Sequence, residues 1–403
     1  MPKIRIIETD KTGSVQASAI SNVVFVPITA AAGTAGFEPT LFSSVNAFKE
    51  FIEEKVPVAS GDSFIDTPRA NIDHLDCCLC IHLLRLGFQV LVEGITAEEP
   101  SWQKLQDKGL YDIRFLTNGT QPQTAGIPAG MIECAKKRGD CVALVNADES
   151  DEFTYDITTV RSVFSGISDG EFAAGFTPWF YTNNSDFANV LDTSNQKVEN
   201  PKIPAAFGYL FAYANAIKNY PEWYAIAGFE RGIIPELTGV AHEYSSAEIE
   251  ILQSRASTAA VELDDKTDNV GVAINPIANI RPAGYIIYGN RTLRSNDDTK
   301  KLIATSFLNV RNAVSAIKKV MYEASRKYTF EQNTETLWIN FQSYVTPLLD
   351  NMKSGNGILG YKFIKVKTNA KARLKARLNI IPVEAVEDFD LEVYLTDDLT
   401  VSE

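Results

Sequence analysis

Apolar residues recur at two different spacings along this 403-residue chain, and each spacing predicts a different kind of element. In the last third the spacing is three or four positions, which places apolar side chains on one face of a helix. One helix within 302–328 follows from Val310, Val314, Ile317 and Met321, and a second over 334–353 follows from Leu337, Phe341, Tyr344, Leu348 and Met352. We expect Asn333 to cap the second helix and Gly355 and Gly357 to end it.

After these helices apolar residues alternate with polar ones, which is the period of a half-buried strand. The alternation predicts strands around 361–363, 374–380 and 389–395. A short strand of the same character is expected near the first residues, where Ile4 and Ile6 alternate with Lys3 and Arg5. Both ends of the sequence are therefore expected to be short amphipathic strands, each of which needs the edge of a sheet because it is too small to be stable alone.

The first two thirds of the chain mix helical patterns with continuous apolar runs. The runs at 22–28, 88–92 and 141–146 predict buried strands, and the intervening patterns predict helices at 43–52, 73–86 and 205–217. Helices that alternate with apolar strands are typical of an α/β layer.

These patterns divide the chain into four predicted parts. We expect an N-terminal arm strand and linker over 1–20 and an outer α/β domain over 21–270, with a division of that domain into two left open. An α+β domain of two helices and a sheet is expected over 271–385, followed by a C-terminal arm strand over 386–403. The predicted fold class is therefore α/β combined with α+β.

Composition and charge exclude some classes of function. Lys and Arg number 38 against 51 Asp and Glu, a formal net charge of −13, whereas a nucleic-acid binder needs a basic surface. The same charge disfavours docking on an anionic membrane, and no stretch approaches the ~20 apolar residues of a membrane span. The first residues lack the apolar segment of a signal peptide, and five Cys do not form a disulfide framework, so we expect a soluble cytoplasmic protein.

The sign of the charge inverts within the predicted C-terminal sheet. The window 351–383 contains no Asp or Glu but eight basic residues, including Lys371, Arg373, Lys375 and Arg377. From Glu384 onward there are eight acidic residues and no Lys or Arg. A solvated sheet face with a loose acidic tail is the simplest interpretation. The strict alternation of Phe389, Leu391, Val393 and Leu395 favours instead a strand that pairs with the basic sheet, in its own chain or by addition to a neighbouring subunit.

Candidate catalytic or metal-binding residues are few. Cys77, Cys78, Cys80 and His82 lie close in sequence, but they lack the two separated ligand pairs of a structural zinc site, and buried packing is the expected role. The acidic residues at 148–152 lack the ligand spacing of a calcium loop. No phosphate-binding loop, dinucleotide fingerprint or nucleophile elbow is present. We therefore predict no catalytic residue, no metal and no cofactor, which favours a structural role.

An ordered series of short motifs resembles the sheath proteins of contractile phage tails and related injection particles. The series begins with NVVFVPI at 22–28 and continues with FTPW at 176–179 and YPEWYAIAG at 220–228. The match of highest similarity is GVAINPI at 271–277 followed by GYIIYGNRTL at 284–293. This segment corresponds to a core motif of the family and contains Asn275, Pro276, Gly284, Gly289, Arg291 and Thr292.

The resemblance implies a subunit that stacks as hexameric rings around a tail tube and contracts to drive the tube through a cell envelope. It implies that terminal arms add strands to the sheets of neighbouring copies, here through Ile4, Arg5, Ile6, Ile7, Phe389, Leu391, Val393 and Leu395. Adjacent sheath subunits, a tail tube protein, and baseplate and tail terminator proteins would be the partners, without nucleic acid or membrane insertion. The particle tail, assembled in the host cytoplasm, would be the location.

Two other classes of function stay open from the sequence. A non-contractile shell protein would also self-assemble, but with one fixed length per ring. A cytosolic α/β enzyme that uses the segment from Cys77 to His82 would be a small, uniform oligomer.

Overall fold

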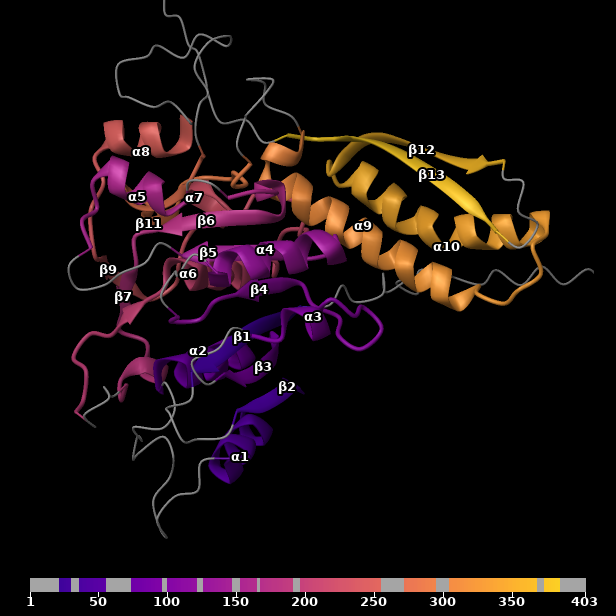
Figure 1. The fold of residues 1–403 in the computed structure, drawn as a ribbon. Helices are drawn as coiled ribbons and strands as arrows, with labels where there is room; N and C mark the ends of the chain where they lie inside the picture. The colour runs from indigo at the N-terminus through magenta and orange to yellow at the C-terminus, as the bar shows by residue number, and fades with distance from the viewer. Residues whose placement is uncertain are drawn as a thin grey trace, which may run out of the picture.

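The computed structural model describes residues 22–29, 36–55, 74–95, 100–121, 126–146, 153–164, 167–190, 196–254, 272–294, 304–367 and 373–384. Within these ranges the chain forms an α/β body and a helix-and-hairpin unit that projects from one side of it (Figure 1). The predicted combination of α/β and α+β structure is confirmed.

An eight-stranded sheet in the order β11-β10-β6-β5-β4-β1-β3-β2 forms the centre of the body. Its strands are β1 (Val23–Thr29), β2 (Phe37–Phe42), β3 (Gln89–Ile95), β4 (Phe115–Thr117), β5 (Val142–Asn146), β6 (Ala173–Thr177), β10 (Asn275–Ile280) and β11 (Gly284–Ile287). The central strands of the sheet, which are β10, β6, β5, β4, β1 and β3, run parallel to one another. The edge strands β2 and β11 are antiparallel to their neighbours. Buried parallel strands explain the continuous apolar runs of the sequence.

Helices cover both faces of this sheet. Val24, Val26 and Ile28 of β1 pack into a core shared with α1 (Val45–Lys55), α2 (His74–Arg85) and α6 (Ala205–Ala216). Val23 and Phe25 point into the opposite core. That core is shared with α3 (Trp102–Leu105), α4 (Gly126–Arg138), α5 (Ile157–Val163) and α8 (Ser246–Ser254). The alternation within one strand therefore divides the body into two apolar layers.

Smaller elements complete the body. A three-stranded sheet contains β7 (Phe180–Thr182), β8 (Lys202–Ile203) and β9 (Leu237–Val240), and α7 (Gly228–Arg231) follows α6. Short 3-10 turns span Gly170–Phe172, Ser185–Phe187 and Ala304–Ser306. No helix in the described part of the chain is both long and apolar enough to cross a bilayer.

The helix-and-hairpin unit contains α9 (Leu308–Lys327), α10 (Glu335–Ser354) and a two-stranded sheet of β12 (Ile358–Val366) and β13 (Lys375–Pro382). One core joins both helices to one face of the hairpin, with Ile317, Phe341 and Leu349 at its centre. Both predicted helices are confirmed, but α9 begins later than expected because residues 304–306 form a 3-10 turn. The N-cap of α10 is Thr334 rather than Asn333, because the Thr334 side chain accepts a hydrogen bond from the Leu337 backbone N–H.

The large sheet continues across the domain boundary that the sequence placed between residues 270 and 271. β10 pairs with β6 of the body, and β11 pairs with β10. The elements that pack together as a separate helix-and-hairpin unit therefore begin near residue 304. Pairing between β6 and β10 joins residues about a hundred positions apart, which local sequence patterns do not reveal.

Candidate assembly surfaces

Among the residues that the structure describes, the hairpin of the helix-and-hairpin unit has open edges. β12 pairs with β13 in antiparallel register from Ile358 opposite Pro382 to Val366 opposite Lys375. Neither strand pairs with a third strand among the residues that the structure describes. Open edges present unpaired backbone N–H and C=O groups, which are the groups that an added strand uses.

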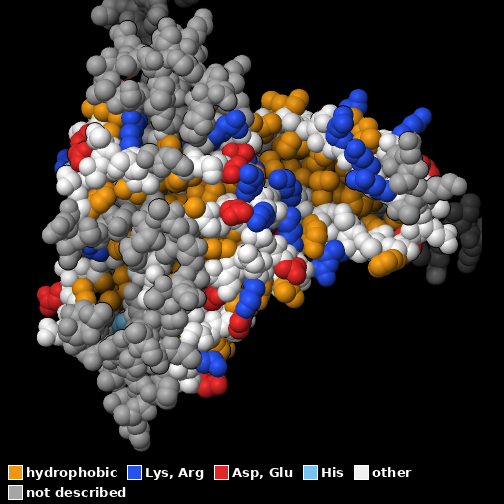
Figure 2. Space-filling view, viewed as in Figure 1, with side chains coloured by type: hydrophobic (Ala, Val, Ile, Leu, Met, Phe, Trp, Pro, Cys, Tyr) orange, Lys and Arg blue, Asp and Glu red, His pale blue; other side chains and the backbone are white. Residues whose placement is uncertain are grey.

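The two faces of the hairpin differ in chemistry. Tyr361 and Phe363 of β12 lie opposite Ile380 and Leu378 of β13, and these side chains pack on the core of α9 and α10. On the other face the exposed side chains are Leu359, Lys362, Lys375, Arg377, Asn379 and Ile381. Figure 2 shows apolar side chains over this unit bordered by Lys and Arg. An amphipathic, positively charged sheet is suited to a strand that carries apolar residues on one side and acidic residues on the other.

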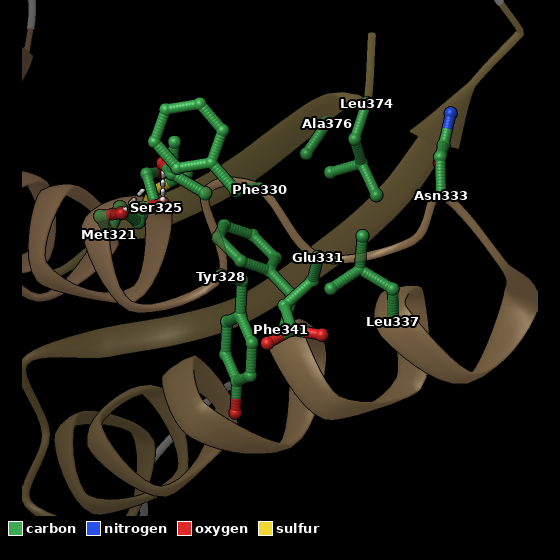
Figure 3. A pocket seen from close by; sticks show the side chains of 11 residues that line it. Met321, Ser325, Tyr328, Phe330, Glu331, Asn333, Leu337, Phe341, Leu374 and Ala376 are labelled. Carbon is green, nitrogen blue, oxygen red and sulfur yellow. Dashed lines mark hydrogen bonds between the residues drawn. The ribbon is translucent and has the colours of Figure 1, made fainter. Parts of the chain in front are cut away.

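A groove of about 440 Å³ lies at the tip of the unit, where the turn between α9 and α10 meets the start of β13. Its apolar lining comes from both helices and from the hairpin, as Figure 3 shows. The lining includes Met321, Tyr328, Leu337, Phe341, Leu374 and Ala376. Phe330 also lines the groove, is fully exposed and has a φ of 72°. A bulky residue in the left-handed region is unusual, and such outliers gather at binding sites.

The predicted site residues are only partly within the described structure. Both sets of arm residues, Ile4 to Ile7 and Phe389 to Leu395, lie outside the described residues, as does Lys371. Arg373, Lys375 and Arg377 are exposed at alternating positions at and beside the start of β13. The structure therefore places Lys375 and Arg377 on the exposed face of β13, with Arg373 exposed just before the strand begins.

The cysteine and histidine cluster of α2 is buried. Cys77, Cys78 and Cys80 are at most 4% exposed, and burial raises the pKa of Cys80 well above its ordinary value, which keeps its thiol protonated. Burial also lowers the pKa of His82 to about 4, and its neutral ring contacts Asp186 with 2.8 Å between Nδ1 and Oδ2. Asp186 is 104 residues away in sequence, so no local signal indicated this contact. In the described ranges no group of three His, Cys, Asp or Glu side chains is placed to hold a metal.

Sequence comparison identifies phage tail sheath proteins as relatives of the chain. No protein-family model matches. The tail sheath protein of Vibrio phage KVP40 is 24% identical over 160 residues, which are 40% of this chain and 20% of the relative. The tail sheath protein of Enterobacteria phage T4 is 22% identical over 283 residues, covering 67% of this chain and 39% of the relative. The chain therefore matches well under half of the length of either relative.

Structural comparison covers the whole chain. The sheath complex of an extracellular contractile injection system, PVC, in its contracted state matches with a TM-score of 0.61 at 16% identity, over 99% of this chain and 98% of that one. A chain of the anti-feeding prophage baseplate matches with a TM-score of 0.62 at 15% identity, over 99% of both chains. The chain has the fold of a contractile sheath protein. The resemblance that the sequence motifs indicated is confirmed.

Asn275, from the motif predicted by the resemblance, clamps three chain segments together through side-chain hydrogen bonds. Asn275 is fully buried at the start of β10, and its Nδ2 donates to the carbonyl oxygens of Gly175 (3.0 Å) and Arg291 (2.9 Å). Its Oδ1 accepts from the Arg291 backbone N–H at 2.7 Å. A side chain on Gly289 would meet Asn275, since an added Cβ would lie 2.8 Å from Oδ1. One amide thus joins β6, β10 and the segment that leads toward α9.

The remaining motif residues continue this connection. Pro276 lies opposite Thr177 of β6, and Gly284, the first residue of β11, has a φ of 81°, a conformation in which glycine is favoured. The Arg291 guanidinium lies 4.6 Å from the Phe307 ring centroid, and the Thr292 hydroxyl donates to the Thr305 carbonyl oxygen. These contacts join the segment before the helix-and-hairpin unit to the start of α9 and to the body.

Proposed function

We propose that this chain is a structural subunit of a contractile sheath. The observation that carries the proposal is agreement between two independent comparisons: the sequence relatives are tail sheath proteins, and the fold matches a sheath complex over 99% of the chain. The proposed role is non-enzymatic, in keeping with those structural relatives. Copies of the chain would stack as hexameric rings around a tail tube, in the tail of a phage or a related particle assembled in the host cytoplasm.

Strand addition to the open hairpin is the proposed link between copies. The N-terminal residues 3–8 and the C-terminal residues 389–395 of neighbouring copies would pair with the free edges of β12 and β13. Two features support this assignment: both edges lack a partner among described residues, and one face of each strand is apolar. Strand addition would satisfy the backbone groups of both partners and fix their register.

Opposite charges on the C-terminal arm and on β13 favour one order of the strands in this pairing. The predicted C-terminal arm contains Asp390 and Glu392 between its apolar residues, whereas the exposed face of β13 contains Lys375 and Arg377. A strand that places Phe389 and Leu391 toward the helices would place its carboxylates on the basic face. Cross-strand pairs of opposite charge contribute roughly 0.2–1 kcal/mol each, enough over several pairs to favour one strand order.

The energy for contraction would come from surface buried between copies. At about 25 cal/mol per Å² of apolar surface, a few hundred additional Å² per subunit supplies several kcal/mol.

A tail tube protein, baseplate components and a tail terminator would be the other partners. Charged side chains of α9 and α10 would line the inner face of the assembled sheath in this proposal. They would bind the tail tube weakly enough to release it.

Electron microscopy of the purified full chain tests the proposal. We expect helical tubes or ring stacks, and we expect loss of these assemblies when residues 1–10 or 386–403 are deleted. The control variant is Leu110→Ser, a substitution at a 71% exposed position of the body. We expect this variant to assemble as the native chain does. Normal tubes from both truncations would refute strand exchange, and a small uniform oligomer from the intact chain would refute the sheath role.

A further inference from the structure

The groove at the tip of the helix-and-hairpin unit lies on the β13 side of the hairpin. Leu374 and Ala376, beside and within the start of β13, line it, whereas no described residue of β12 does. Met321 of α9 and Phe341 of α10 line it from the helices, as Figure 3 shows. The edge of β13 that faces away from β12 has no strand partner among the residues that the structure describes. A strand added to that edge would therefore cover the groove.

The face of β13 that packs on the helices is an apolar row that is only partly covered. Its side chains contact the core of α9 and α10, yet each of them stays partly exposed. The row consists of Leu374, Ala376, Leu378 and Ile380. The opposite face of the same strand carries the exposed Lys375 and Arg377. A third strand with apolar residues on one face and acidic residues on the other would match both faces of β13.

The direction of β13 determines where the residues after it begin. β13 starts at the groove and ends at the opposite end of the unit, where the Val383 backbone N–H donates to the Gly357 carbonyl oxygen at 3.2 Å. Residues 385–403 continue from that end. A segment that returns from there to the groove runs antiparallel to β13 over about 26 Å, the length of eight residues in a strand. The nineteen residues that follow residue 384 are enough for a short turn and such a strand.

The sequence after β13 suits antiparallel pairing with its open edge. With a turn over residues 383–386, Glu392 would lie opposite Arg377 on the exposed face. Because residues of a strand alternate between its faces, four apolar residues would then all lie opposite the apolar row. These pairs are Phe389 with Ile380, Leu391 with Leu378, Val393 with Ala376, and Leu395 with Leu374. Four-residue turns are common in hairpins, and a slip by one residue would expose the whole apolar set to solvent.

We propose that in a free subunit residues 387–395 pair in this register with β13 of their own chain, and that Leu395 enters the groove. Only four residues separate the two strands, so the effective concentration of the segment at its own β13 is roughly millimolar. That exceeds the concentration of neighbouring copies in a dilute solution, so pairing within the chain prevails there. In the proposed sheath the same segment would exchange to β13 of a neighbour, as in domain swapping. The exchange rests on the proposed function, whereas pairing within the free subunit does not.

Disulfide trapping in the full chain tests the pairing. Arg377→Cys with Glu392→Cys introduces two cysteines on the exposed face, directly opposite each other in the proposed register and within reach of a disulfide. The native cysteines are buried and do not compete. The control, Lys362→Cys with Glu392→Cys, moves one cysteine to the exposed face of β12, one strand further away and out of reach. The protein is oxidised at a dilution at which sedimentation shows monomers, and mass spectrometry of peptides locates the bonds.

The four outcomes of trapping separate the possible occupants of the β13 edge. We expect the pair at Arg377 and Glu392 to form a bond within one chain at least tenfold faster than the control pair. A bond that forms only between chains would overturn pairing within the free subunit and leave the proposed link between copies standing. A faster bond in the control pair would place the segment on β12 and overturn the proposal. No bond in monomers or in tubes would overturn both uses of β13.

Hydrogen exchange of the unsubstituted chain provides a second measurement. Neighbouring amides of a strand point to opposite edges, so about half of the β13 amides point away from β12. In dilute monomer we expect these amides to exchange at least tenfold more slowly in the full chain than after deletion of residues 386–403. The amides of α2, which packs in the core of the body, are the internal control and should keep their rate. Equal rates at β13 in both proteins would overturn the pairing, whether or not tubes form.

The trapped chain also tests what the pairing does to assembly. A bond within the chain prevents exchange of the segment, and an occupied edge offers no template to another copy. We expect oxidation to abolish tube formation by the Arg377→Cys and Glu392→Cys variant, and reductant to restore it, with no such effect in the control. Tubes from the reduced variant establish assembly independently of this step. Tubes from the trapped chain at the same concentration would overturn exchange of the segment as the route to assembly.

Discussion

Trp223 of the body donates its indole N–H to the carbonyl oxygen of Gly355, at 2.9 Å, where α10 ends. The indole also lies against Gly357, so the helix-and-hairpin unit closes around one aromatic side chain of the body. Asn309 of α9 donates to the Trp223 carbonyl oxygen at 3.4 Å. Two glycines that the sequence suggested as the end of a helix thus also provide space for a contact between the two parts of the molecule.

Substitution of Gly357 by Ala tests this contact. An added Cβ would lie 2.5 Å from Cδ1 of Trp223, closer than side chains pack, so either the indole or the start of β12 must move. We expect the free energy of unfolding to fall by about 1–3 kcal/mol, measured by urea denaturation. Gly360→Ala in β12 is the control, because nothing lies within 4 Å of its added Cβ, and it should raise stability by at most about 1 kcal/mol. Equal effects from both substitutions would contradict a specific Trp223 contact.

The clamp formed by Asn275 makes a second prediction. Asn275→Ala removes two donated hydrogen bonds and one accepted bond in a fully buried site, leaving backbone groups of Gly175 and Arg291 without their partner. We expect a loss of at least about 2 kcal/mol in the free energy of unfolding, measured by chemical denaturation. Asn279→Ala, at an exposed position of the same strand, should change stability by less than about 0.5 kcal/mol. A similar loss at both positions would mean that strand propensity, and not the clamp, sets the effect.

Local sequence patterns predicted where helices and strands lie better than they predicted which elements pack against one another. α9, α10 and β13 follow from the spacing of apolar residues because each is stabilised by one apolar face. The buried polar face of α9 could not be predicted, since Asn309, Asn312 and Lys319, which are at most 7% exposed, have the composition of a solvent-exposed face. Burial of that face depends on Tyr209 and Asp112, which are separated from it by about a hundred residues or more. The same limit applies to the contact between His82 and Asp186.

The buried carboxyl of Glu222 predicts a pH dependence of stability. Burial is the largest cause that raises its pKa above 4.5, opposed by Arg114, by the Tyr213 hydroxyl and by Lys319. A carboxyl with a raised pKa binds its proton more tightly in the folded chain. Its contribution to stability is therefore largest at low pH and is lost as the pH rises through the folded-state pKa. Glu222→Gln removes this titration.

Urea denaturation of both proteins at several pH values measures the effect. We expect the free energy of unfolding of Glu222→Gln, relative to the native chain, to increase steadily from pH 4.5 toward neutral pH. Glu248→Gln is a suitable control for direction, since hydrogen bonds from Ser245 lower the pKa of Glu248 and reverse the sign of the dependence. A difference that stays constant with pH would show that Glu222 titrates as it does in the unfolded chain.

Charge reversal tests which residues receive the C-terminal arm in the proposed sheath. Lys375→Glu with Arg377→Glu places two acidic side chains on the exposed face of β13, opposite the acidic arm. These side chains are exposed, so folding should be unchanged, whereas each like-charge pair disfavours strand addition by about 0.2–1 kcal/mol. Because every copy in a tube makes the same contact, we expect the concentration needed for polymerisation to rise severalfold, as measured by sedimentation. Adding Asp390→Lys and Glu392→Lys should restore polymerisation, and the arm substitutions alone should impair it. Failure of the combined variant to recover, despite normal folding, would place the acidic arm on a surface other than β13.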